Sequence, residues 1–108
     1  MIRLGSWNVG SLTGKLRELA ATMVRRRVNI LCVQETKWNG QKAKEVDNTG
    51  FKLWYTGTTL DRNGVGVSID KSLKDGVVEV KRQRDRIILV KLVISDMILN
   101  VISVYAPK

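Results

Sequence analysis

The chain has 108 residues, and 19 Lys and Arg against 10 Asp and Glu give it a formal net charge of +9. A hydrophobic fraction of 44% suits one globular domain and argues against a disordered tail. The apolar runs are interrupted too early to span a membrane and the start of the chain lacks a signal-peptide pattern, so we expect a nuclear or cytoplasmic protein. The sequence contains no histidine and a single cysteine, which excludes histidine general bases, histidine or thiolate zinc sites and an internal disulfide.

The first third of the sequence predicts a strand, a helix and a second strand. Residues 2–9 alternate as a strand that ends near Asn8, and residues 15–27 place apolar side chains at helical spacing. Residues 28–33 form a nearly continuous apolar run, which is typical of a strand buried on both faces. This order predicts a right-handed βαβ unit with parallel strands. If the two strands are neighbours, Asn8 and Glu35 lie close together at the carboxyl edge of the sheet, where open α/β sheets usually bind ligands.

The rest of the chain predicts mainly strands. Residues 37–50 are polar and predict a loop with at most one helical turn. Residues 51–56 and 64–69 alternate as strands on either side of an Asn-Gly pair, so they should form an antiparallel hairpin. Three more strands are expected at 77–80, 86–94 and 97–105. One helix cannot cover both faces of these seven strands, so we expect a partner subunit or a further piece of polypeptide to cover the rest.

Glu35 is the most informative polar residue of the chain. An ionised carboxylate directly after a buried strand is costly unless it is paired or binds a cation, so Glu35 fits either an ion pair with Lys37 or an arginine, or a metal ligand. Asn8 fits a turn residue or an amide that positions a phosphate, and Tyr105 fits a packed phenol or a donor to a phosphate oxygen. The chemistry open to such residues is that of carboxylates, amides, a phenol and a hard cation such as Mg²⁺.

Basic residues gather in two segments. Residues 25–27 are three arginines in the last turn of the predicted helix, which fits either stabilisation of the helix dipole by positive charge or a nucleic-acid contact. Residues 81–86 are the densest basic cluster of the second half, which fits either a solvated turn or phosphate contacts. Trp38, in a polar loop, is the tryptophan that best fits a base-stacking role, with packing as the alternative. The net charge of +9 favours DNA or another phosphate-bearing partner.

Four short motifs carry a resemblance to a known family: residues 6–8 (SWN), 34–37 (QETK), 63–67 (NGVGV) and 104–107 (VYAP). Their order and spacing resemble the endonuclease/exonuclease/phosphatase superfamily. The resemblance is closest to the apurinic-like endonuclease domains of LINE retrotransposons, including the craniofacial-development-protein-like sequences. It implies a DNase I-like α/β fold, a sandwich of two sheets, of which residues 1–108 would be the amino-terminal half, with a mixed sheet and one main helix.

The resemblance also implies roles for the strand-end residues. Glu35 would be a ligand of Mg²⁺, with Mn²⁺ as an alternative, Asn8 an amide that supports the metal or the phosphate, and Tyr105 a phenol that contacts the phosphate. The implied reaction is attack of water on a DNA phosphodiester. Gly10 departs from the family, because abasic-site enzymes carry an acidic residue there. The Asp/Asn pair and the Asp-His pair of the family's second half are absent, so we expect the chain alone to be inactive.

Two other functions remain open from the sequence. The chain fits a phosphatase or phospholipase of the same superfamily, which would act on small phosphoesters, and it also fits a non-catalytic nucleic-acid-binding remnant. In each case we expect the absent carboxy-terminal half to provide the second sheet, or self-association to cover the exposed one.

Overall fold

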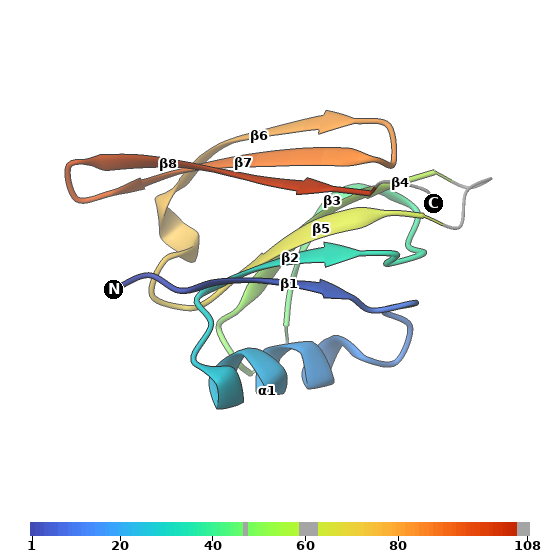
Figure 1. Ribbon diagram of the computed structural model, residues 1–108, viewed down its shortest axis with the longest axis horizontal. Helices are drawn as coiled ribbons and strands as arrows, with labels where there is room; N and C mark the ends of the chain where they lie inside the picture. Colours follow the sequence, from blue (N-terminus) through green and yellow to red (C-terminus); the bar gives the residue numbers. More distant parts are fainter. Residues whose placement is uncertain (47, 59–62, 106–108) are drawn as a thin grey trace.

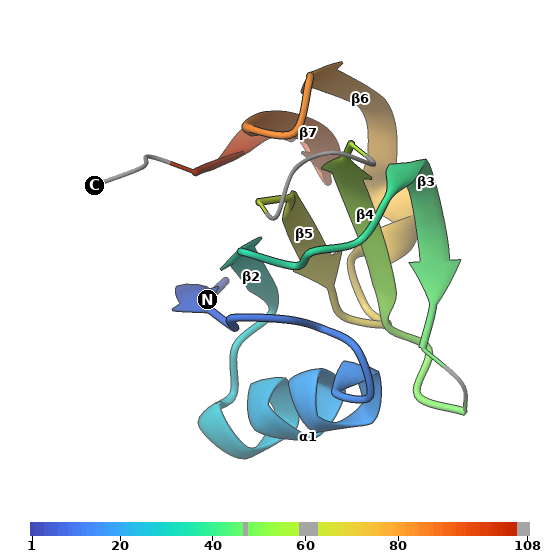
Figure 2. The same cartoon turned by 90° about the vertical axis from the view of Figure 1, so that its right-hand side faces the viewer.

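The computed structural model describes residues 1–46, 48–58 and 63–105, which form three layers (Figures 1 and 2). The elements in chain order are β1 (Leu4–Asn8), α1 (Leu16–Arg26), β2 (Ile30–Gln34), β3 (Gly40–Glu45), β4 (Lys52–Gly57), β5 (Val65–Ile69), the short 3₁₀ helix η1 (Lys74–Gly76), β6 (Val77–Gln83), β7 (Ile87–Ile94) and β8 (Met97–Val104). The helix α1 covers a five-stranded sheet of order β1-β2-β5-β4-β3, and the other face of that sheet packs on a three-stranded sheet of order β6-β7-β8. Neither helix in this part of the chain is long and apolar enough to cross a membrane.

The predicted βαβ unit is confirmed. Strands β1 and β2 are parallel neighbours, with Asn8 opposite Gln34 in the register. The helix between them buries one apolar face and ends at Arg27, whose left-handed φ of 56° lets its N–H close the last turn on the carbonyls of Met23 and Val24. The predicted hairpin is also confirmed, because β4 and β5 pair antiparallel.

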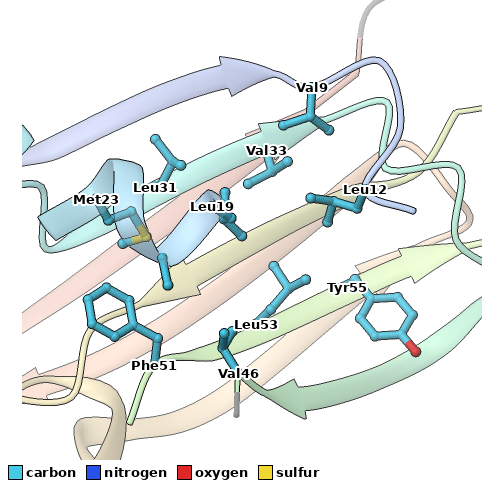
Figure 3. Close-up of a cluster of buried hydrophobic side chains, with 11 residues drawn as sticks. Val9, Leu12, Leu19, Met23, Leu31, Val33, Val46, Phe51, Leu53 and Tyr55 are labelled. Atoms are coloured by element: carbon cyan, nitrogen blue, oxygen red, sulfur yellow. The ribbon is translucent and has the colours of Figure 1, made fainter. Parts of the chain in front are cut away.

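The first hydrophobic core lies between α1 and the five-stranded sheet, where apolar side chains of the helix meet those of β2 and β4 (Figure 3). Its buried members are Val9, Leu12, Leu19, Ala20, Met23, Leu31, Val33, Val46, Phe51, Leu53 and Tyr55. Val9 and Leu12 come from the loop between β1 and α1, so this core also fixes the loop that follows Asn8.

The loop predicted at 37–50 is wrong in part, because β3 lies within it. This strand pairs antiparallel with β4 at the edge of the five-stranded sheet. Its residues from Gln41 to Glu45 are exposed, so the strand lacks the apolar alternation that would reveal it, and two lysines suit an unpaired edge. The strand predicted at 77–80 is also longer than expected, since β6 continues to Gln83.

The expectation that the absent half provides the second sheet also needs correction. The chain itself builds three strands of that sheet, and β8 lies against β2: the Ser103 hydroxyl donates to the Val33 carbonyl at 3.2 Å. A second core fills the space between the sheets, and its buried members are Ile30, Trp54, Val65, Val67, Ile69, Ile88, Val90, Leu92 and Val101. The apolar pattern of β7 and β8 could not show that these strands leave the first sheet, because a buried strand has the same pattern in either sheet.

One face of the three-stranded sheet remains uncovered, as the excess of apolar strands predicts. Ile98 on β8 is 62% exposed, and apolar side chains on the same face of β7 and β8 are exposed with it: Val93, Ile102 and Val104. On the five-stranded sheet, Leu4 of the edge strand β1 is 58% exposed. Contiguous exposed apolar side chains of this kind mark a surface suited to burial against more polypeptide.

Candidate functional site

The three site residues predicted from the sequence lie at one end of the molecule. Asn8 ends β1, Glu35 directly follows β2, and Tyr105 directly follows β8. These three strands run in the same direction (Figure 1), and Figure 2 looks onto the end where they finish. The ends of β2 and β8 are linked, because the Gln34 side-chain amide donates to the Ser103 hydroxyl at 3.4 Å.

Glu35 has an unusual backbone conformation for a glutamate. Its φ is 57°, in the left-handed region that costs a non-glycine residue about 1–2 kcal/mol. The side chain is half-buried, and no described residue forms an ion pair or a hydrogen bond with its carboxylate. The pairing with Lys37 or an arginine that the sequence left open is therefore not found among the described residues.

The segment around Glu35 is held by backbone hydrogen bonds to two other parts of the chain. The N–H of Thr36 donates to the Gly64 carbonyl at 3.2 Å, and its carbonyl accepts from the N–H of Leu12 at 3.0 Å. Thr36 is fully buried, and a Cβ on Gly64 would overlap its hydroxyl, so only glycine fits there. The strained φ of Glu35 is thus imposed by its surroundings, as is common where a side chain must be presented at a site.

Asn8 is exposed and faces the start of the loop before α1. Its Oδ1 accepts a hydrogen bond from the N–H of Gly10 at 3.2 Å, which leaves one lone pair and both N–H donors of the amide available. Gln34, the register partner of Asn8, accepts from the Ser6 hydroxyl through Oε1 at 3.3 Å. Two side-chain amides therefore stand side by side at the strand ends, next to Glu35.

Tyr105 is half-buried and packs against the core between the two sheets. Its N–H donates to the Arg86 carbonyl at 2.9 Å, which fixes the backbone just beyond β8. These contacts establish a packing role for the residue, and its role toward phosphate remains a prediction. Residues 106–107 of the VYAP motif lie outside the described residues.

The turn between β6 and β7 also reaches this end of the molecule. Asp85 in the turn is 2% exposed and accepts a hydrogen bond from the Asn63 side-chain amide at 3.1 Å. Arg82, which the sequence placed in a basic cluster that fits a solvated turn, lies in β6. Its guanidinium donates hydrogen bonds to the carbonyls of Tyr55 and Lys42, each at 3.1 Å, and burial lowers its pKa.

Several of these contacts were missed by sequence reasoning. Gln34 and Ser103 are polar residues in mainly apolar strands, and that signal could have marked them as facing polar partners. Asp85 lies within a basic cluster, where no local pattern indicates that its carboxylate turns inward to Asn63.

Trp38 combines packing with partial exposure. Its ring is half-buried against the first core and meets the Tyr55 ring edge-on, with 5.2 Å between the ring centroids. The ammonium of Lys44 lies 5.8 Å from the Trp38 ring centroid. These contacts show that Trp38 packs against the core, and base stacking by its ring stays a prediction.

The side-chain oxygens of Glu35 and Asn8 at the strand ends suit part of the coordination shell of the Mg²⁺ that the resemblance implies. Within residues 1–46, 48–58 and 63–105, no group of three or more His, Cys, Asp and Glu is placed to hold a metal. Mg²⁺, however, is typically bound through one or two carboxylates and keeps several waters. The carboxylate of Glu35, for which the described residues include no partner, and the amide oxygen of Asn8 are oxygen ligands of the kind that Mg²⁺ prefers.

Two curated proteins resemble the chain in sequence. It is 34% identical over 106 residues to craniofacial development protein 2 of Bos taurus, and 32% identical over 106 residues to the protein of that name from Tragulus javanicus. Each match covers 96% of this chain and 18% of the relative, so the chain spans about a fifth of the length of these relatives. No protein-family model matches the chain.

Solved structures share the fold. The chain superimposes on an AP endonuclease from Archaeoglobus fulgidus with a TM-score of 0.72 and 23% identity, over 99% of this chain and 42% of that one. It superimposes on a 3′ phosphatase from Neisseria, bound to a product DNA hairpin, with a TM-score of 0.69 and 22% identity, over 97% of this chain and 41% of that one. The three layers described above therefore have a DNase I-like fold and correspond to about 40% of the chains of these two structures.

Proposed function

Because the chain belongs to the endonuclease/exonuclease/phosphatase superfamily and corresponds to the amino-terminal part of its fold, we propose that it carries part of the active site of a Mg²⁺-dependent DNA endonuclease of the retrotransposon type. The observation that carries this proposal is Glu35, a carboxylate without a partner among the described residues, held in a strained conformation at the carboxyl end of a buried strand. The net charge of +9 supports a polyanionic substrate.

Each residue at the strand ends has a role in this proposal. Glu35 would bind Mg²⁺, or Mn²⁺ in its place, and the Asn8 amide would orient the phosphate or support the metal. Tyr105 would donate its phenol O–H to a phosphate oxygen. When bound, Mg²⁺ stabilises negative charge on a phosphodiester during in-line displacement. The anchored backbone around Glu35 and Asn8 holds both groups in place before a substrate arrives.

The chain alone should not cleave DNA. It contains no histidine, and Glu35 is the one carboxylate at the strand ends for which the described residues include no partner, so the described residues offer no second unpaired carboxylate there as a general base. We propose that the remainder of the domain supplies that group and covers the exposed apolar face around Ile98, or that a second copy covers the face. A nuclear or cytoplasmic location is part of the same proposal.

Binding and nicking of DNA test the proposal together. The purified chain is titrated into a labelled duplex with an abasic site, with Mg²⁺ or with EDTA at matched ionic strength. We expect Mg²⁺ to strengthen binding by the wild type and not by Glu35→Gln, while the control Glu18→Gln, at an exposed position of α1, behaves as the wild type. An equal response to Mg²⁺ in the Glu35→Gln variant, or none in the wild type, would refute the assignment of Glu35.

The same experiment addresses inactivity and the alternatives. Nicking of supercoiled DNA that disappears in Glu35→Gln would overturn the proposal that the chain alone is inactive. Binding that weakens steeply with salt but ignores Mg²⁺ would favour a non-catalytic nucleic-acid-binding remnant, for which the net charge of +9 is the supporting observation. Glu35-dependent hydrolysis of a 3′-phosphate or another small phosphoester, without DNA nicking, would favour a phosphatase or phospholipase.

A further inference from the structure

The turn between β6 and β7 carries two arginines at the end of the molecule that holds the candidate site, and neither has a neutralising partner among the described residues. Arg84 and Arg86 are both exposed, and neither forms an ion pair with a described residue. In the sequence, Asp85 stands between them and would balance part of their charge. In the structure the Asp85 side chain is buried and hydrogen-bonded to Asn63, so its carboxylate points inward while both arginines are exposed.

This turn is anchored on both sides of the sandwich. The Thr56 hydroxyl donates to the Arg84 carbonyl, and the Arg86 carbonyl accepts from the N–H of Tyr105 at 2.9 Å. Arg84 itself has a left-handed φ of 54°, which costs a non-glycine residue about 1–2 kcal/mol. Three tertiary contacts hold a strained turn, so the direction in which the two arginines leave the backbone is set before any ligand binds.

The position of the turn connects it to the strand ends. Asn63, which holds Asp85, also accepts the N–H of Lys37 on its carbonyl at 2.8 Å, two residues beyond Glu35. Arg86 is bonded through its carbonyl to Tyr105. The basic turn is therefore linked to the Glu35 segment by two hydrogen bonds through Asn63, and to Tyr105 by one direct hydrogen bond.

We propose that Arg84 and Arg86 bind phosphates of one DNA strand that neighbour the phosphate at the Asn8 and Glu35 site, and that Asp85 is a positioning residue that holds the turn. This inference rests on the proposed function, because it takes the strand-end site as the place where the DNA lies. A planar guanidinium presents a fork of N–H donors that matches phosphate oxygens, and arginines held in place lose less entropy when they bind than arginines on a loose loop.

Two charge-matched double variants test the inference. Arg84→Gln/Arg86→Gln removes two charges at the site, and Arg25→Gln/Arg26→Gln removes two exposed charges at the last turn of α1, at the opposite end of the molecule (Figure 1). The dissociation constant for a DNA duplex is measured against salt concentration. Loss of two phosphate contacts should reduce the salt slope by about 1.8, which is roughly a 60-fold loss of affinity at 0.1 M salt. We expect this loss in the first variant and little change in the second.

The outcomes separate this inference from the proposed function. Equal slopes in the two double variants would show that only net charge matters and would overturn the inference, even if Glu35-dependent binding in Mg²⁺ persists. If the wild type shows no Glu35-dependent strengthening of binding by Mg²⁺, but Arg84→Gln/Arg86→Gln still reduces the salt slope as expected, the role of Glu35 is contradicted and the inference about the arginines stands. Replacing Asn63 with alanine tests the positioning role: it frees the turn without changing charge, and should weaken binding while the chain keeps its wild-type fluorescence and circular dichroism. Unchanged binding would mean that Asp85 does not position the arginines.

Discussion

Replacing Gly64 with alanine should destabilise the protein and loosen the segment that carries Glu35. Gly64 has a φ of 96°, and a side-chain carbon at this position would overlap the hydroxyl of the fully buried Thr36. Thr36 cannot move freely, because its hydroxyl accepts the N–H of Trp38 at 3.3 Å and its backbone bonds to Leu12 and Gly64. The substitution must therefore strain the backbone and break part of this network.

The magnitude follows from two separate costs. A non-glycine residue in this conformation costs about 1–3 kcal/mol, and displacement of Thr36 costs about 1–2 kcal/mol in weakened hydrogen bonds, so Gly64→Ala should lower the free energy of unfolding by about 2–5 kcal/mol. Gly10→Ala is the matched control, because Gly10 has a φ of 73° and no described residue other than its chain neighbours lies within 4 Å of the added carbon. It should lose only the backbone cost, about 1 kcal/mol.

Urea unfolding followed by tryptophan fluorescence measures both variants, since the chain has three tryptophans, of which Trp54 is buried and Trp38 lies beside Thr36. Gly64→Ala should shift the midpoint further than Gly10→Ala by an amount equivalent to at least about 1 kcal/mol. Equal midpoints would show that the contact between Gly64 and Thr36 does not constrain the Glu35 segment, and would refute the argument that the strain at Glu35 is imposed by its surroundings.

Three further predictions concern the exposed face, the inter-sheet contact and the cysteine. Ile98→Lys should reduce self-association in light scattering and change the free energy of unfolding by less than about 0.5 kcal/mol, whereas Ile88→Ala in the buried row of β7 should cost about 2–5 kcal/mol; equal effects would contradict the assigned faces. Ser103→Ala leaves the Val33 carbonyl and the Gln34 amide without their partner and should cost about 1–3 kcal/mol in urea unfolding; no loss would mean that the link between β2 and β8 is not needed. Burial raises the pKa of Cys32, so the folded state holds the thiol proton more tightly and the free energy of unfolding should fall as pH rises past the ordinary thiol pKa. Alkylation slower than that of a free thiol at the same alkaline pH would agree, and an equal rate would not.

Local periodicity was enough to predict most of the strands and the helix. The βαβ unit and the β4–β5 hairpin could be predicted because apolar spacing and an Asn-Gly turn are local signals. Strand β3 could not, because an exposed edge strand carries no apolar alternation. The division into two sheets is also hidden from the sequence, since the inward residues of β7 have the same apolar character whether they face a helix or a second sheet.

The sequence could predict which residues lie at the candidate site only where the order and direction of the strands determine their positions. Parallel strands bring Asn8 and the residue after Gln34 to one edge, and the contact of Ser103 with β2 brings the end of β8 there as well. The conformation of Glu35 and the inward turn of Asp85 depend on hydrogen bonds between residues far apart in the sequence, which spacing alone does not reveal.

Paramagnetic broadening by Mn²⁺ tests the central assignment most directly. Mn²⁺ can replace Mg²⁺ at oxygen-donor sites and broadens the amide signals of nearby residues in NMR spectra. In the wild type, we predict that low Mn²⁺ concentrations broaden the signals of Asn8 and of residues 34–37 first, and that Glu35→Gln abolishes this selectivity while Glu18→Gln keeps it. Broadening that starts elsewhere, or that is unchanged in Glu35→Gln, would contradict a metal site at the end of β2.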